Sequence, residues 1–279
     1  MIDIRTALEH ALLQLGPVNP DSRLEAEILL GQVLHQNRAY LFAHPEKLIS
    51  HTQLDAYQAF IAKRVQGVPI AYITGIRSFW SLSLNVNQHT LIPRHETEQL
   101  VELTLELIPN KPDIQILDLG TGSGAIALAL AQERPNWQID ACDLSQDALL
   151  VAQDNAQKHQ ISNVNFYQSD WFNNLKPKRY HAIVSNPPYI APQDPHLQQG
   201  DVRFEPQSAL VSGQEGLADL QYLIEHSRDH LQPDGLLLLE HGYDQKLHLS
   251  AILKKLGYKN IQSWQDLQGH YRMSGGMYS

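Results

Sequence analysis

A glycine-rich segment at residues 118–124 has the sequence Asp-Leu-Gly-Thr-Gly-Ser-Gly and lies between two apolar stretches. Glycines allow a backbone to approach a ligand closely, and the free N–H groups at the start of a following helix favour a polar or anionic group. Asp143 follows the next apolar stretch, about twenty residues later, where a carboxylate can accept hydrogen bonds from ribose hydroxyls. The spacing predicts a strand, a loop and a helix that bind a nucleotide-like cofactor.

Two kinds of cofactor fit this loop. The glycines also satisfy the dinucleotide pattern Gly-x-Gly-x-x-Ala, so they alone do not distinguish NAD from S-adenosylmethionine. Asp118 precedes the first glycine and suits a cationic sulfonium ligand better than a pyrophosphate. After the third expected strand, Asp170 can accept a hydrogen bond from an adenine amino group, and Trp171 can contact the ring. These features favour S-adenosylmethionine, although turn or cap formation also explains Asp118 and Asp170.

A second motif, Asn-Pro-Pro-Tyr at residues 186–189, follows an apolar strand at the sheet edge where ligands of open α/β folds bind. Its two prolines remove two N–H donors and stiffen the segment. The side chain of Asn186 and the carbonyl of Pro187 can accept both hydrogens of a planar NH2 group, and Tyr189 can lie against that group. A plain turn is the alternative, because Asn-Pro often starts turns. Beside the glycine loop, the motif predicts methyl transfer to an amino or amide nitrogen without a conventional general base.

The chain around these motifs alternates strands and helices. The expected strands are Ile114–Asp118, Gln138–Cys142, Val164–Gln168, His181–Ser185, Leu236–Glu240 and Lys259–Trp264. Repeated strand and helix units imply an α/β fold, with a mostly parallel sheet and helices on both faces.

The N-terminal part has a different pattern. Residues 1–75 show apolar positions at helical spacing and predict a small helical domain. Residues 76–94 alternate apolar and polar side chains and predict a β-hairpin linker, with its turn near Asn87-Gln88. A Rossmann-like catalytic domain is expected over residues 95–279.

Composition excludes several classes of protein. The net charge of −9 comes from residues 81–279, which hold fourteen Lys/Arg and twenty-three Asp/Glu, so direct binding of nucleic acid is not expected. The single cysteine, Cys142, lies in an apolar strand pattern, and the fourteen histidines show no recognisable ligand spacing, so no metal site is expected. Without a membrane-length apolar run or signal-like start, a cytoplasmic protein is expected.

The motifs together resemble the PrmC (HemK) family of release factor glutamine methyltransferases over essentially the whole chain. Four further segments carry the resemblance: residues 69–75 (Pro-Ile-Ala-Tyr-Ile-Thr-Gly), 79–80 (Phe-Trp), 91–94 (Leu-Ile-Pro-Arg) and 201–206 (Asp-Val-Arg-Phe-Glu-Pro). The family implies a helical N-terminal domain, a hairpin and a seven-stranded class I methyltransferase domain. Its substrate is the glutamine of the Gly-Gly-Gln motif in class I peptide chain release factors. We expect the helical domain to recognise the protein substrate, because the site alone can contact little beyond one side chain.

The resemblance also implies roles for individual residues. The S-adenosylmethionine loop would consist of Gly120, Thr121, Gly122, Ser123 and Gly124. Asp143 would bind the ribose, and Trp171 would lie beside the adenine. Asn186, Pro187, Pro188 and Tyr189 would hold the glutamine, with Asn186 also near the cofactor. His95 departs from the family pattern, which has a proline there.

Three alternative functions remain open from the sequence. An adenine-amino DNA methyltransferase uses the same kind of motif on a similar planar NH2 group, although the acidic catalytic half argues against it. A non-catalytic adaptor with a relic methyltransferase fold is the second alternative. An NAD oxidoreductase is the third.

Overall fold

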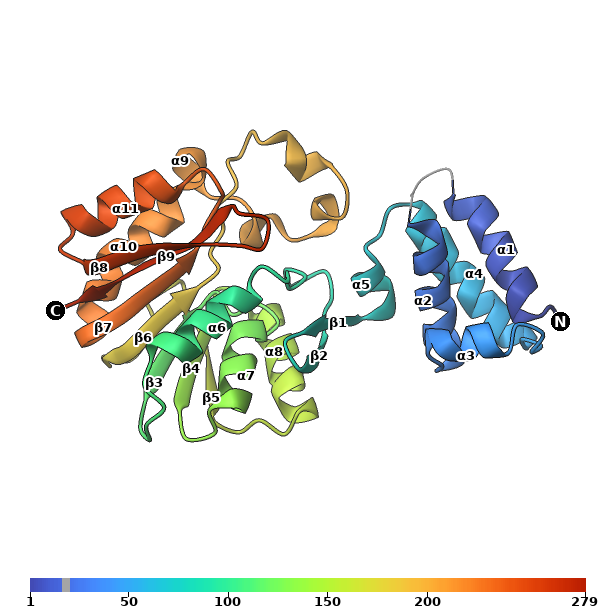
Figure 1. The fold of residues 1–279 in the computed structure, drawn as a ribbon, viewed down its shortest axis with the longest axis horizontal. Coiled ribbons are helices and arrows are strands. Elements are labelled where there is room, and N and C mark those ends of the chain that lie inside the picture. Colours follow the sequence, from blue (N-terminus) through green and yellow to red (C-terminus); the bar gives the residue numbers. More distant parts are fainter. Residues whose placement is uncertain (17–20) are drawn as a thin grey trace. The chain divides into compact units, whose positions relative to one another are not determined.

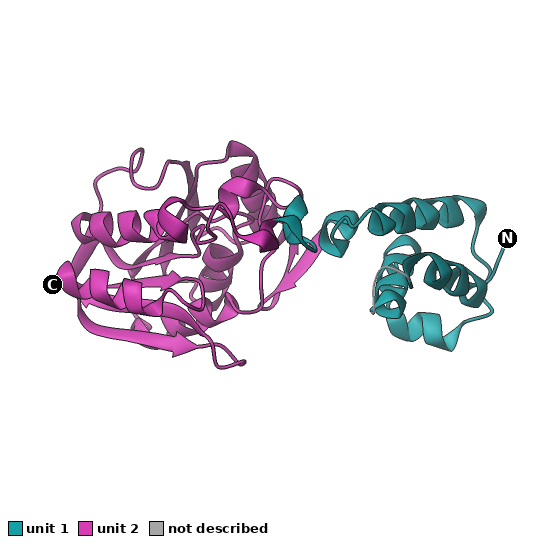
Figure 2. Ribbon diagram, turned by 90° about the horizontal axis from the view of Figure 1, so that it is seen from above, with its two compact units in different colours: residues 1–75, 198–204 teal, residues 76–197, 205–279 magenta. Residues whose placement is uncertain are grey.

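A computed structural model describes residues 1–16 and 21–279 of the protein (Figure 1). The chain divides into two units, coloured separately in Figure 2. The first unit comprises residues 1–75 and 198–204, and the second comprises residues 76–197 and 205–279. The chain therefore contributes to the first unit twice.

The first unit is helical. Its helices are α1 (Ile4–Leu15), α2 (Ser22–Leu34), α3 (Arg38–Ala43), α4 (His51–Val65) and α5 (Ile70–Thr74). Helix α1 begins after Asp3, whose carboxylate accepts a hydrogen bond from the Thr6 N–H at 2.8 Å. Helix α4 begins with a capping box in which Ser50 and Gln53 satisfy each other's backbone N–H groups. The apolar faces of α1, α2 and α4 enclose one core.

Arg64 joins the two parts of the first unit. Its guanidinium donates two hydrogen bonds of 2.8 Å to the carboxylate of Glu25 on α2. It also reaches Asp201 at 3.2 Å, and Asp201 belongs to the segment 198–204. The Arg64 side chain is largely buried, so these charge-assisted bonds replace its lost hydration.

A β-hairpin starts the second unit. Strands β1 (Ile76–Phe79) and β2 (Leu82–Asn85) are antiparallel and are joined by Trp80-Ser81. A turn does form near Asn87-Gln88, where the Thr90 N–H donates to the Asn87 carbonyl at 3.0 Å, but it follows the hairpin and does not join its strands, so the predicted position of the hairpin turn is wrong. The actual turn lacks glycine, proline and asparagine; Trp80 adopts a left-handed φ of 54°, and the side chain of Glu98 accepts a hydrogen bond from its backbone N–H.

A seven-stranded sheet forms the centre of the second unit. Its strands are β3 (Gln115–Leu119), β4 (Gln138–Asp143), β5 (Val164–Gln168), β6 (Tyr180–Ser185), β7 (Leu231–Glu240), β8 (Lys259–Gln265) and β9 (Tyr271–Tyr278). Their order is β5-β4-β3-β6-β7-β9-β8, and β9 is antiparallel to both of its neighbours. The α/β fold expected from the sequence is confirmed, with β9 as a strand that the alternation pattern missed.

Helices cover both faces of this sheet (Figure 1). The longer ones are α6 (Glu98–Leu107), α7 (Ala125–Glu133), α8 (Gln146–Lys158), α10 (Ala218–His230) and α11 (Lys246–Lys255). The short ones are η1 (Pro195–Gln198), η2 (Val202–Phe204), η3 (Gln207–Ala209) and α9 (Gly213–Gly216). One core contains residues of α6, α7 and α8, and the opposite core contains residues of α10 and α11. In the described part of the chain, no helix is long and apolar enough to cross a membrane.

Candidate active site

A pocket of about 320 Å³ lies where the strand order of the sheet reverses. Strand β3 has β4 on one side and β6 on the other, and the loops after β3 and β6 leave in different directions. Open α/β sheets bind their ligands at this position. The pocket is lined by His89, Thr90, Leu91, Gly120, Gly122, Asp143, Leu144, Ser145, Ala148, Ser169, Asp170, Trp171, Asn186, Pro188, Pro206, Ser208, Ala209, Val211 and Asp219. Both sequence motifs therefore contribute to one pocket.

The three glycines of the loop all have positive φ angles, but they have different surroundings. A Cβ on Gly124 would lie 2.9 Å from the Leu128 side chain, so this glycine permits close packing of the loop on α7. A Cβ on Gly120 would contact the Trp171 ring at 3.5 Å. A Cβ on Gly122 would meet no atom of the described residues within 4 Å, so Gly122 borders open space in the pocket.

Asp143 lines the pocket beside the glycine loop. Its carboxylate accepts hydrogen bonds from the N–H groups of Gly122 at 2.8 Å and Ser145 at 2.9 Å. Burial raises the pKa of this carboxyl, while the backbone hydrogen bonds oppose the shift. A loop N–H that already donates to a carboxylate is not free for a pyrophosphate, and the negative charge repels one. The wall therefore suits a ribose or a cation.

Asp118 lies behind the loop and outside the lining of the pocket. Its carboxylate is fully buried and accepts hydrogen bonds from the Thr121 hydroxyl at 2.6 Å and the Ala127 N–H at 3.2 Å. The other carboxylate oxygen has no hydrogen-bond partner among residues 1–16 and 21–279, and burial raises the pKa of Asp118 to about 7. In this structure Asp118 holds the loop against the start of α7, so any effect on the cofactor is indirect.

Trp171 lies beside Gly120 at the end of the pocket. It has a left-handed φ of 49°, and its indole N–H donates to the carboxylate of Asp219 at 3.2 Å. Asp170 is exposed and accepts a hydrogen bond from the Asn173 side chain at 3.1 Å. Asp143, Asp170 and Asp219 thus border the pocket, and Asp219 could not be identified from any sequence motif.

The Asn-Pro-Pro-Tyr motif is held by a buried network. Asn186 donates its side-chain N–H to the Thr97 hydroxyl at 3.1 Å, and Thr97 donates to Glu240 at 2.7 Å. The Tyr189 hydroxyl donates to the other oxygen of Glu240 at 3.2 Å. Asn186 and Pro188 line the pocket, whereas Pro187 is buried and Tyr189 packs against the core beside α10 and α11. Burial beside Glu240 raises the pKa of Tyr189.

Two further residues missed by the sequence reasoning connect distant segments to the site. Glu205 is buried and accepts hydrogen bonds from the Ile92 N–H at 3.2 Å and from the Arg94 guanidinium. Asn155 on α8 donates to the carbonyls of Asn85 at 3.0 Å and Ser123 at 2.9 Å, so it joins the hairpin to the glycine loop. Glu205 lies in the segment 201–206, which carries part of the family resemblance, so the sequence did contain a signal for it. An asparagine within a helix, such as Asn155, gives no comparable signal.

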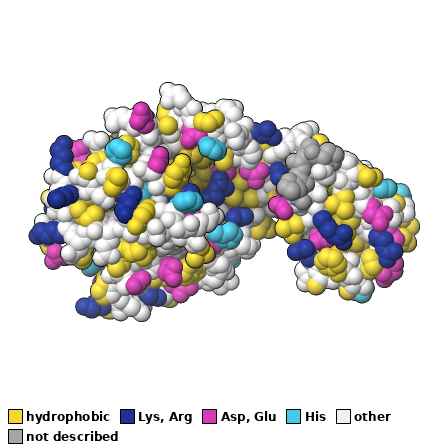
Figure 3. Space-filling view, turned by 45° about the horizontal axis from the view of Figure 1, so that its top comes forward, with side chains coloured by type: hydrophobic (Ala, Val, Ile, Leu, Met, Phe, Trp, Pro, Cys, Tyr) yellow, Lys and Arg dark blue, Asp and Glu magenta, His cyan; other side chains and the backbone are white. Residues whose placement is uncertain are grey.

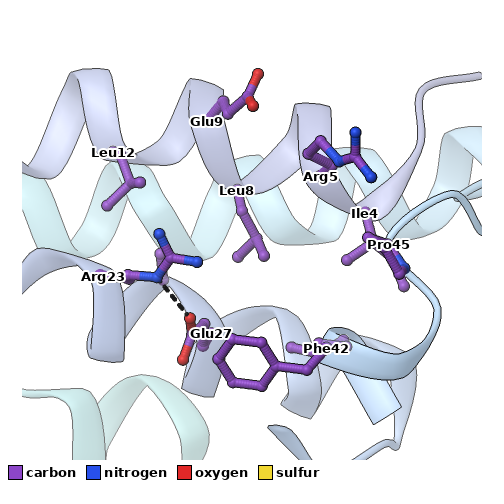
Figure 4. Close-up of a pocket in the computed structure, with 11 residues that line it drawn as sticks. Ile4, Arg5, Leu8, Glu9, Leu12, Arg23, Glu27, Phe42 and Pro45 are labelled. Carbon is purple, nitrogen blue, oxygen red and sulfur yellow. Dashed lines mark hydrogen bonds and ion pairs between the residues drawn. The ribbon is translucent and has the colours of Figure 1, made fainter. Parts of the chain in front are cut away.

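A second pocket lies in the first unit, between α1, α2 and α3 (Figure 4). Leu8, Leu12 and Phe42 give it an apolar lining, and the Phe42 side chain is well exposed. The carboxylate of Glu27 is engaged by Arg23 at 3.1 Å and by Arg38 at 2.6 Å. This pocket therefore suits an apolar side chain rather than acid–base chemistry.

The main pocket offers hydrogen-bond acceptors and an aromatic surface for recognition. Within the residues that the structure describes, no three His, Cys, Asp or Glu side chains gather as metal ligands. Cys142 is buried, and this burial raises the pKa of its thiol, which disfavours the nucleophilic thiolate. Three acidic side chains, an indole and open space beside Gly122 fit a cationic adenosine derivative such as S-adenosylmethionine.

Comparison with known proteins finds relatives of both parts of the chain. The PrmC N-terminal domain family matches residues 6–75, and the Methyltransferase small domain family matches residues 92–202. A release factor glutamine methyltransferase of Shewanella oneidensis is 48% identical over 273 residues, which cover 98% of this chain and 95% of the relative. The corresponding enzyme of Escherichia coli is 46% identical over 271 residues, or 97% of each chain.

Solved structures show the same fold. A methyltransferase of Pyrococcus furiosus has a TM-score of 0.53 at 20% identity, covering 79% of this chain and 96% of its own. A 16S rRNA methyltransferase of T. thermophilus, in complex with AdoMet and guanosine, has a TM-score of 0.52 at 17% identity, covering 73% of this chain and 50% of its own.

Fold and site together define a class I methyltransferase that uses S-adenosylmethionine. The two matched families account for the helical unit and for the part of the second unit that carries both motifs. The chain belongs to the family of release factor glutamine methyltransferases.

Proposed function

We propose that this protein methylates the side-chain amide nitrogen of the glutamine in the Gly-Gly-Gln motif of class I peptide chain release factors, and so acts in translation termination in the cytoplasm. The observation that carries the proposal is the orientation of Asn186: its side-chain N–H donates to Thr97 at 3.1 Å, so its oxygen would be the atom that accepts from a substrate NH2 group. The relatives that match nearly the whole chain are named for this reaction.

The glycine loop and the acidic wall support a position for the cofactor. Residues Gly120, Thr121, Gly122, Ser123 and Gly124 would follow its amino acid and ribose portions, Asp143 would bind the ribose hydroxyls, and Trp171 would contact the adenine. Asp170 borders the same end of the pocket. S-adenosylmethionine supplies an electrophilic methyl group on a sulfonium sulfur.

The protein's task is to place the amide nitrogen, because that nitrogen is a poor nucleophile whose lone pair is delocalised into the carbonyl. In-line transfer needs nitrogen and methyl carbon about 3 Å apart and aligned. The side-chain oxygen of Asn186, which lines the pocket, would accept from one N–H group and favour the charge that develops on nitrogen. The proton becomes acidic only as the new bond forms, so no conventional general base is required.

An adenine-amino methyltransferase remains the enzymatic rival because adenine presents a similar NH2 group. Charge favours a protein substrate: the chain carries a net charge of −9, and acidic side chains are interspersed with basic ones on the face shown in Figure 3. Binding to DNA phosphates normally recruits several Lys or Arg side chains. We propose that the helical first unit recognises the release factor, through its apolar pocket.

The test is to incubate the purified protein with methyl-labelled S-adenosylmethionine and either a release factor or duplex DNA. Mass spectrometry should show one added methyl group on the glutamine of the Gly-Gly-Gln motif. Label in DNA and none in the factor would refute the proposed substrate while leaving the fold and cofactor intact.

A further inference from the structure

The buried carboxylate of Glu240 is connected to the pocket through two hydrogen bonds. Glu240 ends β7 and is 2% exposed, and Thr97 precedes α6 and is 4% exposed. The Thr97 hydroxyl lies 2.7 Å from Oε2 of Glu240 and 3.1 Å from Nδ2 of Asn186. Of these three residues, Asn186 lines the pocket. The chain of contacts therefore leads from a buried charge to the substrate side of the site.

The direction of these bonds follows from the protons available. An ionised carboxylate can only accept hydrogen bonds, so Thr97 must donate its hydroxyl hydrogen to Glu240. A hydroxyl has one hydrogen, so Thr97 can only accept from Asn186. The Asn186 amide must then present its NH2 group to Thr97. A reversed amide would set two acceptors, the Asn186 and Thr97 oxygens, against each other.

We propose that Glu240 and Thr97 are positioning residues that fix the Asn186 amide with its oxygen toward the pocket, and so select a substrate that donates from an NH2 group. This inference rests on the proposed function for the identity of that substrate. With Asn186 held this way, a glutamine amide finds an acceptor, while a glutamate carboxylate meets another oxygen. An unmade bond of this kind discriminates by about ten-fold or more.

The other groups around Glu240 support an ionised, acceptor-only state at alkaline pH. The Tyr189 hydroxyl donates to Oε1 at 3.2 Å, and the charges nearby are Arg272 on β9 and Glu96 before α6. Burial raises the pKa of Glu240 to about 7, against the opposing effects of its hydrogen bonds and Arg272. A protonated Glu240 can donate to Thr97, which lets the hydroxyl and the Asn186 amide reverse. Turnover should therefore fall as the pH decreases through about 7.

The test compares two threonine variants of the full-length protein. Thr97→Val keeps the shape of the side chain but removes the hydroxyl, and Thr97→Ser keeps the hydroxyl. Thr104→Val is the matched control, because it removes another buried hydroxyl of α6 whose bond goes to the Leu100 carbonyl. For each protein, kcat for methyl transfer to the release factor is measured from pH 5.5 to 9, about 1.5 units below and 2 above the pKa of Glu240.

Thr97→Val should lower kcat by about ten-fold at high pH and remove the acidic limb of the profile, while the dissociation constant of S-adenosylmethionine stays the same. Thr97→Ser should restore most of the rate and the acidic limb, and Thr104→Val should resemble the wild type. A Thr97→Val enzyme with wild-type rate and an unchanged acidic limb would overturn the inference. Glu240→Gln is a second variant and should also lack that limb. A wild-type enzyme that methylates no glutamine would instead refute the proposed function.

Discussion

The Gly122 N–H donates to Oδ2 of Asp143 at 2.8 Å, so one hydrogen bond joins the glycine loop to the end of β4. The same carboxylate borders the pocket and would receive the ribose hydroxyls. Replacing Asp143 by Asn keeps the size of the side chain but removes the charge.

We expect Asp143→Asn to weaken S-adenosylmethionine binding by about ten-fold or more, because hydrogen bonds to a charged acceptor are worth about 1.5–3 kcal/mol each. Isothermal titration calorimetry measures this directly. Asp154→Asn, on the exposed side of α8, is the control and should bind the cofactor normally. Equal affinity in Asp143→Asn would exclude Asp143 from the cofactor site.

Two glycine variants should separate binding from folding. Both Gly122 and Gly124 have left-handed φ angles, so alanine at either costs about 1–2 kcal/mol of strain. At Gly124 the new Cβ would also lie 2.9 Å from Leu128, whereas at Gly122 it would enter open space beside the pocket. Gly124→Ala should therefore lower Tm more, and Gly122→Ala should weaken cofactor binding by about ten-fold at a smaller loss of Tm.

The buried carboxyl of Asp118 should make stability depend on pH. Its pKa is raised to about 7 in the folded protein, so the folded state binds this proton more tightly than the unfolded state. The resulting stabilisation is present at low pH and is lost as pH rises through about 7. Between pH 5 and 8 the loss is about 2–3 kcal/mol. Urea unfolding without cofactor should show a smaller decrease for Asp118→Asn than for the wild type; an identical decrease would contradict the raised pKa.

Asn186→Ala should separate catalysis from cofactor binding. The variant removes the side-chain oxygen that we propose as the acceptor for the substrate, but leaves the hydrogen bond between the glycine loop and Asp143 in place. We expect turnover on the release factor to fall by at least about 100-fold, and the dissociation constant of S-adenosylmethionine to change by less than about three-fold. Single-turnover kinetics with labelled cofactor gives both quantities. Unchanged turnover would remove Asn186 from the mechanism.

The apolar pocket of the first unit offers a test of partner recognition. Phe42 lines this pocket and its side chain is 58% exposed, so Phe42→Ala should leave the fold stable. If the helical unit binds the release factor, this variant should raise KM for the intact factor by several-fold, which is roughly the effect of one lost apolar contact. KM for a short Gly-Gly-Gln peptide should not change. Leu247→Ala, at a 77% exposed position of α11, is the control. If Phe42→Ala and the wild type have equal KM values for the intact factor, this pocket has no role in recognition.

The parts of the fold that the sequence predicted are those with local signals. Strands β3 and β4 appear as apolar runs that end at turn or acidic residues, and the glycines mark the intervening loop. The Asn-Pro-Pro-Tyr motif similarly marks the end of β6. Because parallel strands share one carboxyl edge, these local signals together locate the pocket.

The features that the sequence did not predict depend on contacts between distant residues. The hairpin turn at Trp80 is stabilised by Glu98 and by Glu133, whose carboxylate accepts from the Trp80 indole at 2.7 Å. Thr97 and Glu240 are 143 positions apart and carry no motif. Their pairing becomes visible only when the end of β7 and the start of α6 are placed together.

The segment 198–204 gives the helical unit an unusual order of assembly. Arg64 is synthesised long before its partner Asp201, and every residue of β3 to β6 leaves the ribosome between them. The helical unit can therefore be completed only after most of the Rossmann-like sheet has emerged, although it contains the N-terminus. A fragment that stops at Gly75 lacks one of the carboxylates that neutralise Arg64, and a fragment that starts at Ile76 keeps Asp201 without its arginine. A single cut in the gene therefore cannot yield both units complete.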